Sequence, residues 1–444
     1  MPLAGFPIDK RSALLLDKEN MTKYSISPMS SLYELYLRHP RISTDSRRIE
    51  PDSVFFALRG ASFDGNRFAA DALEKGAAYA VVDDPSLPNT RPDKADRLIV
   101  VDDALQTLQA LAREHRRELG LPILAITGSN GKTTTKELVS RVLAEKYEVY
   151  ATRGNLNNHI GVPLTLLAMT RDVEFGIVEM GASACGEIAL LCSIAEPNYG
   201  IVTNIGRAHL EGFGGPEGVR RGKGELYDWL ARTGGRVFVP ANDPVLMSMA
   251  AERETLAAEC YPTTLADGVE HHLEGDYNRF NVAAAVAVGR YFGVDDERIR
   301  YAVGSYRPDN HRSQKIRTGQ NTLILDCYNS SMQASLVNFR QEPLEGCTRK
   351  ILILGDMLEL GDWSDAEHRH IISLAAEIPD ARILLVGPHF AKAYRSLESR
   401  PADTTLYPSQ EVLAAELRKH PVSQALILVK GSHSIGLERL ADLL

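Results

Sequence analysis

The feature that most constrains this chain is the segment TGSNGKTTT at 127–135, which joins a buried apolar run to an amphipathic stretch. The run PILAIT predicts a strand over 122–127. KELVSRVLAEKY predicts a helix whose apolar side carries Leu138, Val142 and Leu143. A glycine-rich loop between a strand and a helix presents backbone N–H groups and the positive end of the helix dipole to an anion. The segment therefore predicts a polyphosphate site in an α/β fold.

Two side chains of this loop suit phosphate chemistry. Lys132 can reach the outer phosphates, and the Thr133 hydroxyl can bind Mg²⁺. The strict GxxxxGK[ST] pattern fails because Ile126 stands where its first glycine belongs, so an ordinary glycine-rich turn is the alternative. The strand–loop–helix context favours the phosphate site. Its expected residues are Gly128, Ser129, Asn130, Gly131, Lys132, Thr133 and Thr134.

Composition limits the class of protein. The 444 residues exceed one ordinary core, and a net charge of −8 argues against a general nucleic-acid binder. No apolar run approaches the ~20 residues of a membrane helix, and the run at 13–16 is too short for a signal peptide. The 5 cysteines are scattered without a CxxC pair, so neither a disulfide framework nor a zinc site is indicated. We expect a cytoplasmic protein without membrane insertion or a nucleic-acid partner.

The order of apolar runs predicts three α/β units. Residues 1–28 mix charges and prolines and are expected to be a disordered extension, unless the chain starts at Met29. The first unit covers 29–118, the second 119–312, and the third 313–444. Strands alternating with helical stretches predict parallel sheets, with a Rossmann-like layout in the third unit.

Two further candidates follow strands of the central unit. Glu179 ends the strand FGIVEM, where a carboxylate can hold Mg²⁺ or cap the next turn. His209 lies just past the strand YGIVTNIG, and a lone histidine is more often a structural hydrogen-bonding residue than a ligand.

Two polar clusters each allow either a structural or a ligand-binding interpretation. Lys223 is expected to open a helical stretch in RRGKGELYD, where it and the neighbouring arginines either stay solvated or face a substrate phosphate or carboxylate. Asn155, Asn157 and Asn158 in GNLNNHIGVP either cap turns or bind a sugar or nucleotide.

Several phrases resemble the Mur ligases of peptidoglycan synthesis. The matching phrases are TGSNGKTTT, GNLNNHIGVP, VEMGA, TNIGRAHLEGFG, KGEL, LILDCYN, LGDMLELGDWS and VKGSHSIGLE. STDSRRI and FFALRGASFDGNRF resemble the UDP-sugar domain of that family. The resemblance runs in order from about Met29 to the C-terminus, and is greatest to the member that adds D-alanyl-D-alanine to UDP-N-acetylmuramoyl-tripeptide.

The resemblance implies a three-domain fold and an ATP-dependent ligase. In such a reaction ATP phosphorylates the terminal carboxylate of the UDP-linked peptide, and the amine of the D-Ala-D-Ala dipeptide then attacks the acyl phosphate. Phosphoryl transfer of this kind needs positioning and charge neutralisation, which Lys132 and Mg²⁺ would supply. We expect a monomer whose three units close around a shared cleft, because a labile acyl phosphate must be kept from water.

The resemblance also assigns roles by position. Thr133 and Glu179 would hold one Mg²⁺ and His209 a second, while Lys132, His209 and a carbamylated Lys223 would act in catalysis. The remaining implied residues are Asn278 near the adenine, Arg312 and Asp326 near ATP, and Ser46 and Arg47 near the UDP group. Of the asparagine cluster, Asn155 and Asn158 are the residues expected to bind substrate.

Departures from the family pattern keep two alternatives open. The loop around Ser330 and Ser331 is short, His433 stands where an arginine is common, and the stretch 240–275 is short. The alternatives are a Mur-type ligase that adds a single amino acid, and a catalytically impaired homologue that binds nucleotide.

Overall fold

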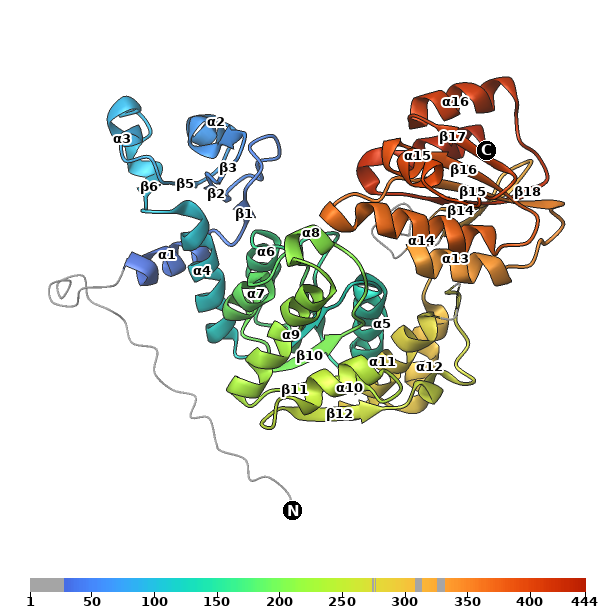
Figure 1. Cartoon of the computed structure of the whole chain (residues 1–444). Coiled ribbons are helices and arrows are strands. Elements are labelled where there is room, and N and C mark those ends of the chain that lie inside the picture. The colour runs from blue at the N-terminus through green and yellow to red at the C-terminus, as the bar shows by residue number, and fades with distance from the viewer. Residues whose placement is uncertain (1–27, 274, 276, 308–313, 326–331) are drawn as a thin grey trace, which may run out of the picture.

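The computed structural model describes residues 28–273, 275, 277–307, 314–325 and 332–444. The described chain builds three main sheets, each from its own stretch of sequence, with helices packed against them. Figure 1 shows the sheets side by side, with the second between the other two. The expected α/β class with a central parallel sheet is confirmed. The exact domain boundaries remain a prediction.

The first sheet has 4 strands in the order β1-β2-β5-β6, all parallel. Beside it lies a small hairpin, β3-β4. The elements of this part are α1 (Pro28–Arg38), β1 (Ile42–Ser43), β2 (Val54–Phe56), β3 (Arg59–Gly60), β4 (Phe63–Asp64), α2 (Ala69–Glu74), β5 (Tyr79–Val82), α3 (Leu87–Thr90), β6 (Leu98–Val100) and α4 (Ala104–Leu119).

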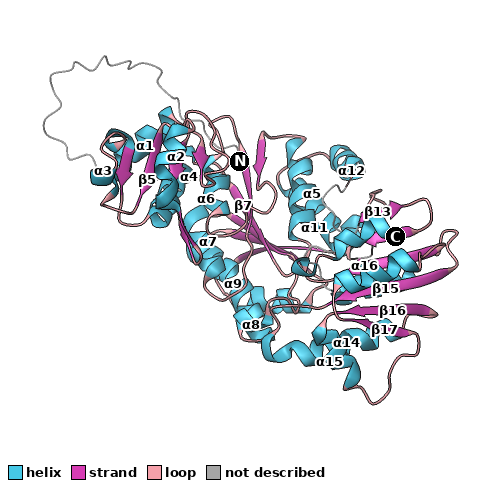
Figure 2. Cartoon of the chain, turned by 90° about the horizontal axis from the view of Figure 1, so that it is seen from above, coloured by secondary structure: helices cyan, strands magenta, loops and turns pink. Residues whose placement is uncertain are grey.

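The central sheet has 6 parallel strands in the order β12-β11-β10-β7-β9-β8. Every residue of β7 and β9 is buried, because helices cover both faces; Figure 2 shows these layers. The elements are β7 (Ile123–Thr127), α5 (Lys132–Ala144), β8 (Val149–Ala151), α6 (Gly161–Leu167), β9 (Phe175–Glu179), α7 (Glu187–Ala195), β10 (Tyr199–Val202), α8 (Leu210–Phe213), α9 (Pro216–Thr233), β11 (Arg236–Pro240), α10 (Pro244–Ala251), β12 (Ala257–Tyr261), α11 (Asn278–Tyr291) and α12 (Asp296–Ser305).

The third sheet has 6 strands in the order β13-β14-β18-β15-β16-β17, with β13 antiparallel to β14. Its elements are β13 (Gln314–Arg317), β14 (Thr322–Leu325), α13 (Met332–Gln341), β15 (Arg349–Gly355), α14 (Ser364–Ala376), β16 (Ala381–Val386), α15 (Pro388–Arg395), β17 (Thr404–Tyr407), α16 (Gln410–Lys419) and β18 (Ala425–Lys430). Short 3₁₀ turns cover Gly65–Phe68, Ala95–Arg97, Thr263–Ala266, Gly361–Trp363, His433–Ile435 and Leu437–Leu443.

Strand direction decides where a ligand can bind. Because β7, β9 and β10 are parallel neighbours, their carboxyl ends meet at one edge of the central sheet. In open α/β sheets, ligands bind outside this edge. Among the described residues, no helix is both long and apolar enough to span a bilayer.

Candidate active site

The loop between β7 and α5 is shaped by two glycines. Gly128 has a φ of +138° and Gly131 a φ of +79°, both in the region that side chains disfavour. A Cβ at Gly128 would lie 2.0 Å from Thr203 Oγ1, and one at Gly131 would lie 2.7 Å from Asn281 Oδ1. The loop therefore fits between the end of β10 and helix α11 only with glycine at these positions.

Lys132 folds back over this loop. Its ammonium group donates to the carbonyl oxygens of Gly128 at 2.7 Å and Ser129 at 3.0 Å. Since Lys132 begins helix α5, its charge lies at the helix N-terminus, where a phosphate would also be attracted to the helix dipole. The expected strand–loop–helix arrangement is therefore present. Thr134, the last expected residue of the loop, lies in the first turn of the same helix.

Thr133 and Glu179 meet inside the protein. The Thr133 hydroxyl donates to Glu179 Oε2 at 2.9 Å, and Asn157 Nδ2 donates to Oε1 at 2.9 Å. Thr133 is 5% exposed and Glu179 1% exposed. The Glu179 carboxylate therefore faces the first turn of α5. A buried hydroxyl beside a buried carboxylate is an oxygen-only donor set of the kind that Mg²⁺ takes.

Lys223 is buried in the middle of a helix. Helix α9 begins at Pro216, so the expectation that Lys223 opens the helical stretch is wrong. The side chain is 2% exposed, and its Nζ donates to Ala182 O at 3.1 Å and lies 5.0 Å from the centre of the Phe213 ring. Burial, with the nearby Lys132 ammonium, lowers the pKa of Lys223 to about 7. A solvated surface lysine is therefore excluded.

The arginines near Lys223 do not join it. Arg220 forms an ion pair with Glu252, and Arg221 is exposed. The possible cluster of three cations around one substrate group is therefore not formed.

His209 lies where the central and third parts of the chain meet. Its Nδ1 pairs with the carboxylate of Glu359, which follows β15. His209 lines two cavities, of about 460 Å³ and about 470 Å³, and so do Ser129 and Lys132. The first cavity continues to His433 and Lys430 of the third part, and the second to Asn158 and Lys223. The strand-edge residues thus face a space with two branches.

Asn278 lies at the start of α11 and is buried. Its Oδ1 accepts from Asn281 Nδ2 at 2.8 Å, and Asn281 Oδ1 accepts from the Thr135 hydroxyl at 3.0 Å. These bonds connect Asn278 to helix α5. Arg312 and Asp326 lie outside the described residues, and so does the short loop at 330–331.

Ser46 and Arg47 lie in the first part of the chain. Exposed Arg47 binds Asp45 and holds the pKa of that carboxyl at about 2, below its usual range, while the Ser46 carbonyl accepts from Lys75 Nζ at 2.8 Å. Asn158 Oδ1 accepts from the N–H groups of Ile160 and Gly161, so it caps helix α6. Asn155 is exposed, and its carbonyl accepts from the N–H of Asn157.

Comparisons with known proteins decide the family. Residues 126–261 match the Mur ligase middle domain, and residues 40–116 match a domain described as "Mur ligase family, catalytic domain". The chain is 33% identical to the UDP-N-acetylmuramoyl-tripeptide–D-alanyl-D-alanine ligase of Bacillus subtilis, over 90% of this chain and 92% of that protein. The enzyme of the same name from Escherichia coli is 30% identical, over 90% and 92%.

This chain belongs to the Mur ligase family. Solved structures agree with the assignment. A crystal structure of MurF from Acinetobacter baumannii has a TM-score of 0.78 and 30% identity, covering 91% of this chain and 93% of that one. MurF ligase from Thermotoga maritima in complex with ADP has a TM-score of 0.76 and 25% identity, covering 92% and 97%.

In this Mur ligase, Asn204 also shapes the loop, a role that was not predicted from the sequence. Its carbonyl accepts from Ser129 N–H at 3.1 Å, its Oδ1 accepts from Asn130 N–H at 3.1 Å, and its Nδ2 donates to Asn130 O at 3.0 Å. Two N–H groups expected to face a phosphate are therefore used to fix the loop. No sequence signal marked this role, because Asn204 falls inside the expected strand YGIVTNIG, whereas β10 ends at Val202.

Proposed function

We propose that this Mur ligase adds D-alanyl-D-alanine to UDP-N-acetylmuramoyl-tripeptide in an ATP-dependent reaction of peptidoglycan synthesis. Relatives at 30–33% identity over most of the chain carry this activity in their names. ADP is bound in the Thermotoga maritima structure, which supports ATP as the nucleotide here. The observation that carries the proposal is the buried Thr133–Glu179 pair next to Lys132, at the strand edge that opens onto Lys223 and His209.

The reaction has two steps with a balanced exchange of groups. A carboxylate oxygen of the tripeptide attacks the γ-phosphorus of ATP, and ADP leaves. The dipeptide amine then attacks the acyl carbon, phosphate leaves and the amine loses a proton. Lys132 neutralises phosphate charge in the first step, and its place at the start of α5 orients the phosphates toward the cavity.

Mg²⁺ would be held by Thr133 and Glu179, with His209 at a second ion, and would supply charge neutralisation for the phosphates. Among the described residues, no group of 3 or more His, Cys, Asp and Glu side chains is placed to hold a metal ion. Mg²⁺ commonly keeps several waters and takes further oxygens from substrate phosphates.

The remaining roles complete the proposal. We assign Asn278, Arg312 and Asp326 to the nucleotide, Ser46 and Arg47 to the UDP group, and Asn155 and Asn158 to the peptide-linked sugar. We assign Lys223 to catalysis as a carbamate, which would turn a buried cation into an anion. The 4 described cysteines are free thiols, which accords with the cytoplasmic location that we propose.

The test is release of ADP and phosphate from MgATP, UDP-tripeptide and D-Ala-D-Ala. Release that needs both co-substrates supports the proposal, and release that ignores them contradicts it. Replacing the dipeptide by single amino acids separates this ligase from one that adds a single residue. Turnover in the native protein that is lost in Lys132→Ala excludes the catalytically impaired homologue.

A further inference from the structure

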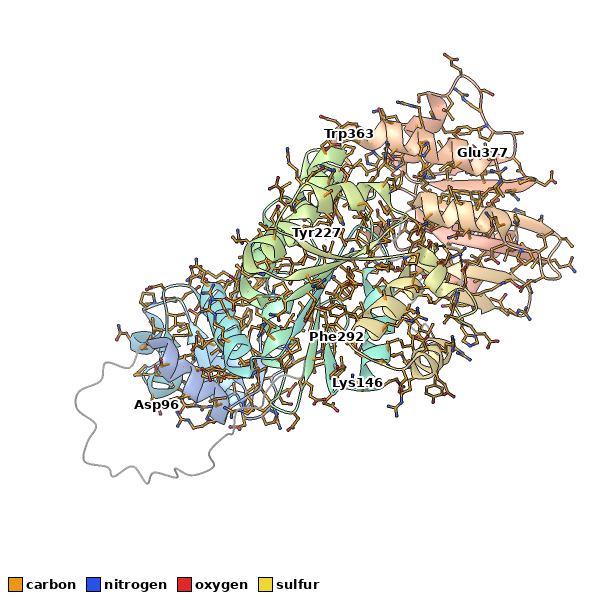
Figure 3. All side chains as sticks on the ribbon, turned by 90° about the horizontal axis from the view of Figure 1, so that it is seen from below. Asp96, Lys146, Tyr227, Phe292, Trp363 and Glu377 are labelled. Carbon is orange, nitrogen blue, oxygen red and sulfur yellow. The ribbon has the colours of Figure 1, made fainter. Side chains whose placement is uncertain are left out.

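The His209–Glu359 pair is part of a docking contact between the central and third parts of the chain. Besides the ion pair, the Glu211 N–H donates to the Glu359 carbonyl at 3.2 Å. Leu360 packs into a small apolar cluster with Leu210, Phe213 and Val219. Figure 3 shows Trp363, from the turn after Leu360, beside the green ribbon of the central part. The contact thus holds the Glu359 loop against the segment that carries His209.

Both residues of the His209–Glu359 pair have an unusual backbone conformation. His209 has a φ of +55° and Glu359 a φ of +62°, two of the 7 non-glycine residues with positive φ in the described chain. Such conformations cost free energy and persist where surrounding contacts impose them, often at functional sites. Here two residues of this kind face each other across the contact between the two parts.

The chemistry of the ring explains what the pair can do. A neutral imidazole has one N–H nitrogen and one nitrogen with a free lone pair. The Glu359 carboxylate accepts a hydrogen bond from His209 Nδ1. It therefore favours the tautomer that carries the proton on Nδ1, and the free lone pair is then on Nε2. None of the described residues forms a hydrogen bond with Nε2. The ring itself lines both cavities beside Lys132.

We propose that Glu359 is a positioning residue, which fixes the tautomer and orientation of His209 so that Nε2 is available to the cavities beside Lys132. The inference rests on the proposed function of His209. Carboxylates that hold the second nitrogen of a ligating histidine typically contribute about 10–100-fold in metal affinity or activity. Glu359 itself does not touch the reacting atoms. It acts through the imidazole.

A second ion pair across the same contact provides a matched control. Arg207 of the central part pairs with Glu367 of α14. Arg207 lies two residues before His209, but the pair does not involve the imidazole. Glu359→Ala and Glu367→Ala each remove one carboxylate from the docking contact, and only the first removes the partner of His209.

The experiment reads the ring directly. The full chain is labelled with ¹⁵N-histidine, and long-range ¹H–¹⁵N spectra are recorded at about pH 8, above the usual imidazole pKa. A His209→Asn variant identifies the His209 signals. We expect the Nδ1–H tautomer in the native protein and in Glu367→Ala, and a mixture of tautomers in Glu359→Ala. Glu359→Gln, whose amide oxygen still accepts from Nδ1–H, should restore much of the native spectrum.

Kinetics complete the test. At saturating substrates, Glu359→Ala should lower kcat about 10–100-fold and raise the Mg²⁺ concentration needed for half-maximal rate, with a smaller kcat effect in Glu367→Ala. An unchanged tautomer in Glu359→Ala overturns the proposal, and so do equal kcat losses in the two variants. Absence of ligase activity in the native protein refutes the proposed function instead, while the spectra still decide whether Glu359 sets the ring.

Discussion

The Thr133 hydroxyl and the Glu179 carboxylate lie 2.9 Å apart, although 46 positions separate them in the sequence. The pairing arises because β7 and β9 are parallel neighbours whose carboxyl ends reach the same edge. Helix α5 begins directly above that edge, so its first turn presents Thr133 to the end of β9. The Thr133 hydroxyl oxygen and a Glu179 carboxylate oxygen therefore both lie at the position proposed for Mg²⁺.

Removing the charge of Glu179 should abolish most turnover. Glu179→Gln keeps the shape but offers Mg²⁺ a neutral oxygen, and we expect ADP release to fall at least ~100-fold, in line with the loss of a major electrostatic contribution. Glu174→Gln is the matched control, because Glu174 is an exposed residue just before the other end of β9. A Glu179→Gln enzyme with native turnover would contradict the metal assignment.

Lys132 should control nucleotide affinity. Lys132→Ala removes the ammonium group at the start of α5, and binding of a fluorescent ATP analogue should weaken at least ~10-fold, about 1.4 kcal/mol. Lys146→Ala is the control. Lys146 lies just after the C-terminal end of the same helix, and its Nζ donates to the Phe292 carbonyl at 2.9 Å. Both residues are labelled in Figure 3. Equal affinities of the two variants would contradict the proposed phosphate contact.

Carbamylation of Lys223 should depend on pH in a defined direction. A neutral amine adds CO₂ to form a carbamate and releases one proton, and the buried Lys223 has a pKa of about 7. At constant CO₂ pressure, the carbamate should therefore increase as the pH rises through about 7, where ordinary lysines are still protonated. The measurement is ¹³C NMR with ¹³CO₂. The signal should be missing in Lys223→Gln, and a signal that persists there belongs to another amine.

His115 should make the fold sensitive to acid. It is buried between α1 and the central part, where Nε2 contacts Met169 O at 2.8 Å and Nδ1 contacts the Tyr33 hydroxyl at 3.1 Å. Burial lowers the pKa of His115, so below the unfolded value of about 6.5 the unfolded chain binds more protons. Stability from this group is therefore present above about pH 6.5 and is lost as the pH falls.

Thermal unfolding at about pH 7.5 and about pH 5.5 tests this. The Tm of the native protein should fall on acidification, and the Tm of His115→Gln should fall by less. At about pH 7.5 the variant should be less stable than the native protein by about 1–3 kcal/mol, because its buried contacts are broken. His420→Gln, at an exposed histidine, should behave like the native protein. Identical acid sensitivity in His115→Gln and the native protein would exclude His115 as the source.

Continuous apolar runs predicted β7 and β9 well. β7 and β9 bury every residue, and their sequences are apolar except for Thr127 and Glu179 at their carboxyl ends, so both strands are recognisable without context. β12, β13 and β17 were missed, because the short segments AAECY, QKIR and TTLY carry polar residues. The start of α9 was also missed, since glycines and charges in PEGVRRGKGEL conceal its helical period.

The candidate site could be predicted where a local motif suggests the chemistry, and its assignment stays a prediction. Lys132, Thr133 and Glu179 stand out from a strand–loop–helix pattern and from a carboxylate at a strand end. Contacts between distant segments give no such signal. Asn204 fixes the loop from the end of β10, and Glu359 reaches His209 across 150 positions.

The packing of α1 and α4 has a practical consequence. Leu35 of α1 and Leu111 of α4 belong to one apolar cluster with Leu166 and Leu191 of the central helices. A fragment beginning at residue 119 would therefore expose apolar side chains of α6 and α7 to solvent, and an exposed apolar surface of this kind promotes aggregation. A shortened protein for crystallisation should therefore keep α1 and α4 together with the central part. The first sheet would be removed by one cut between α1 and β1 and a second between β6 and α4.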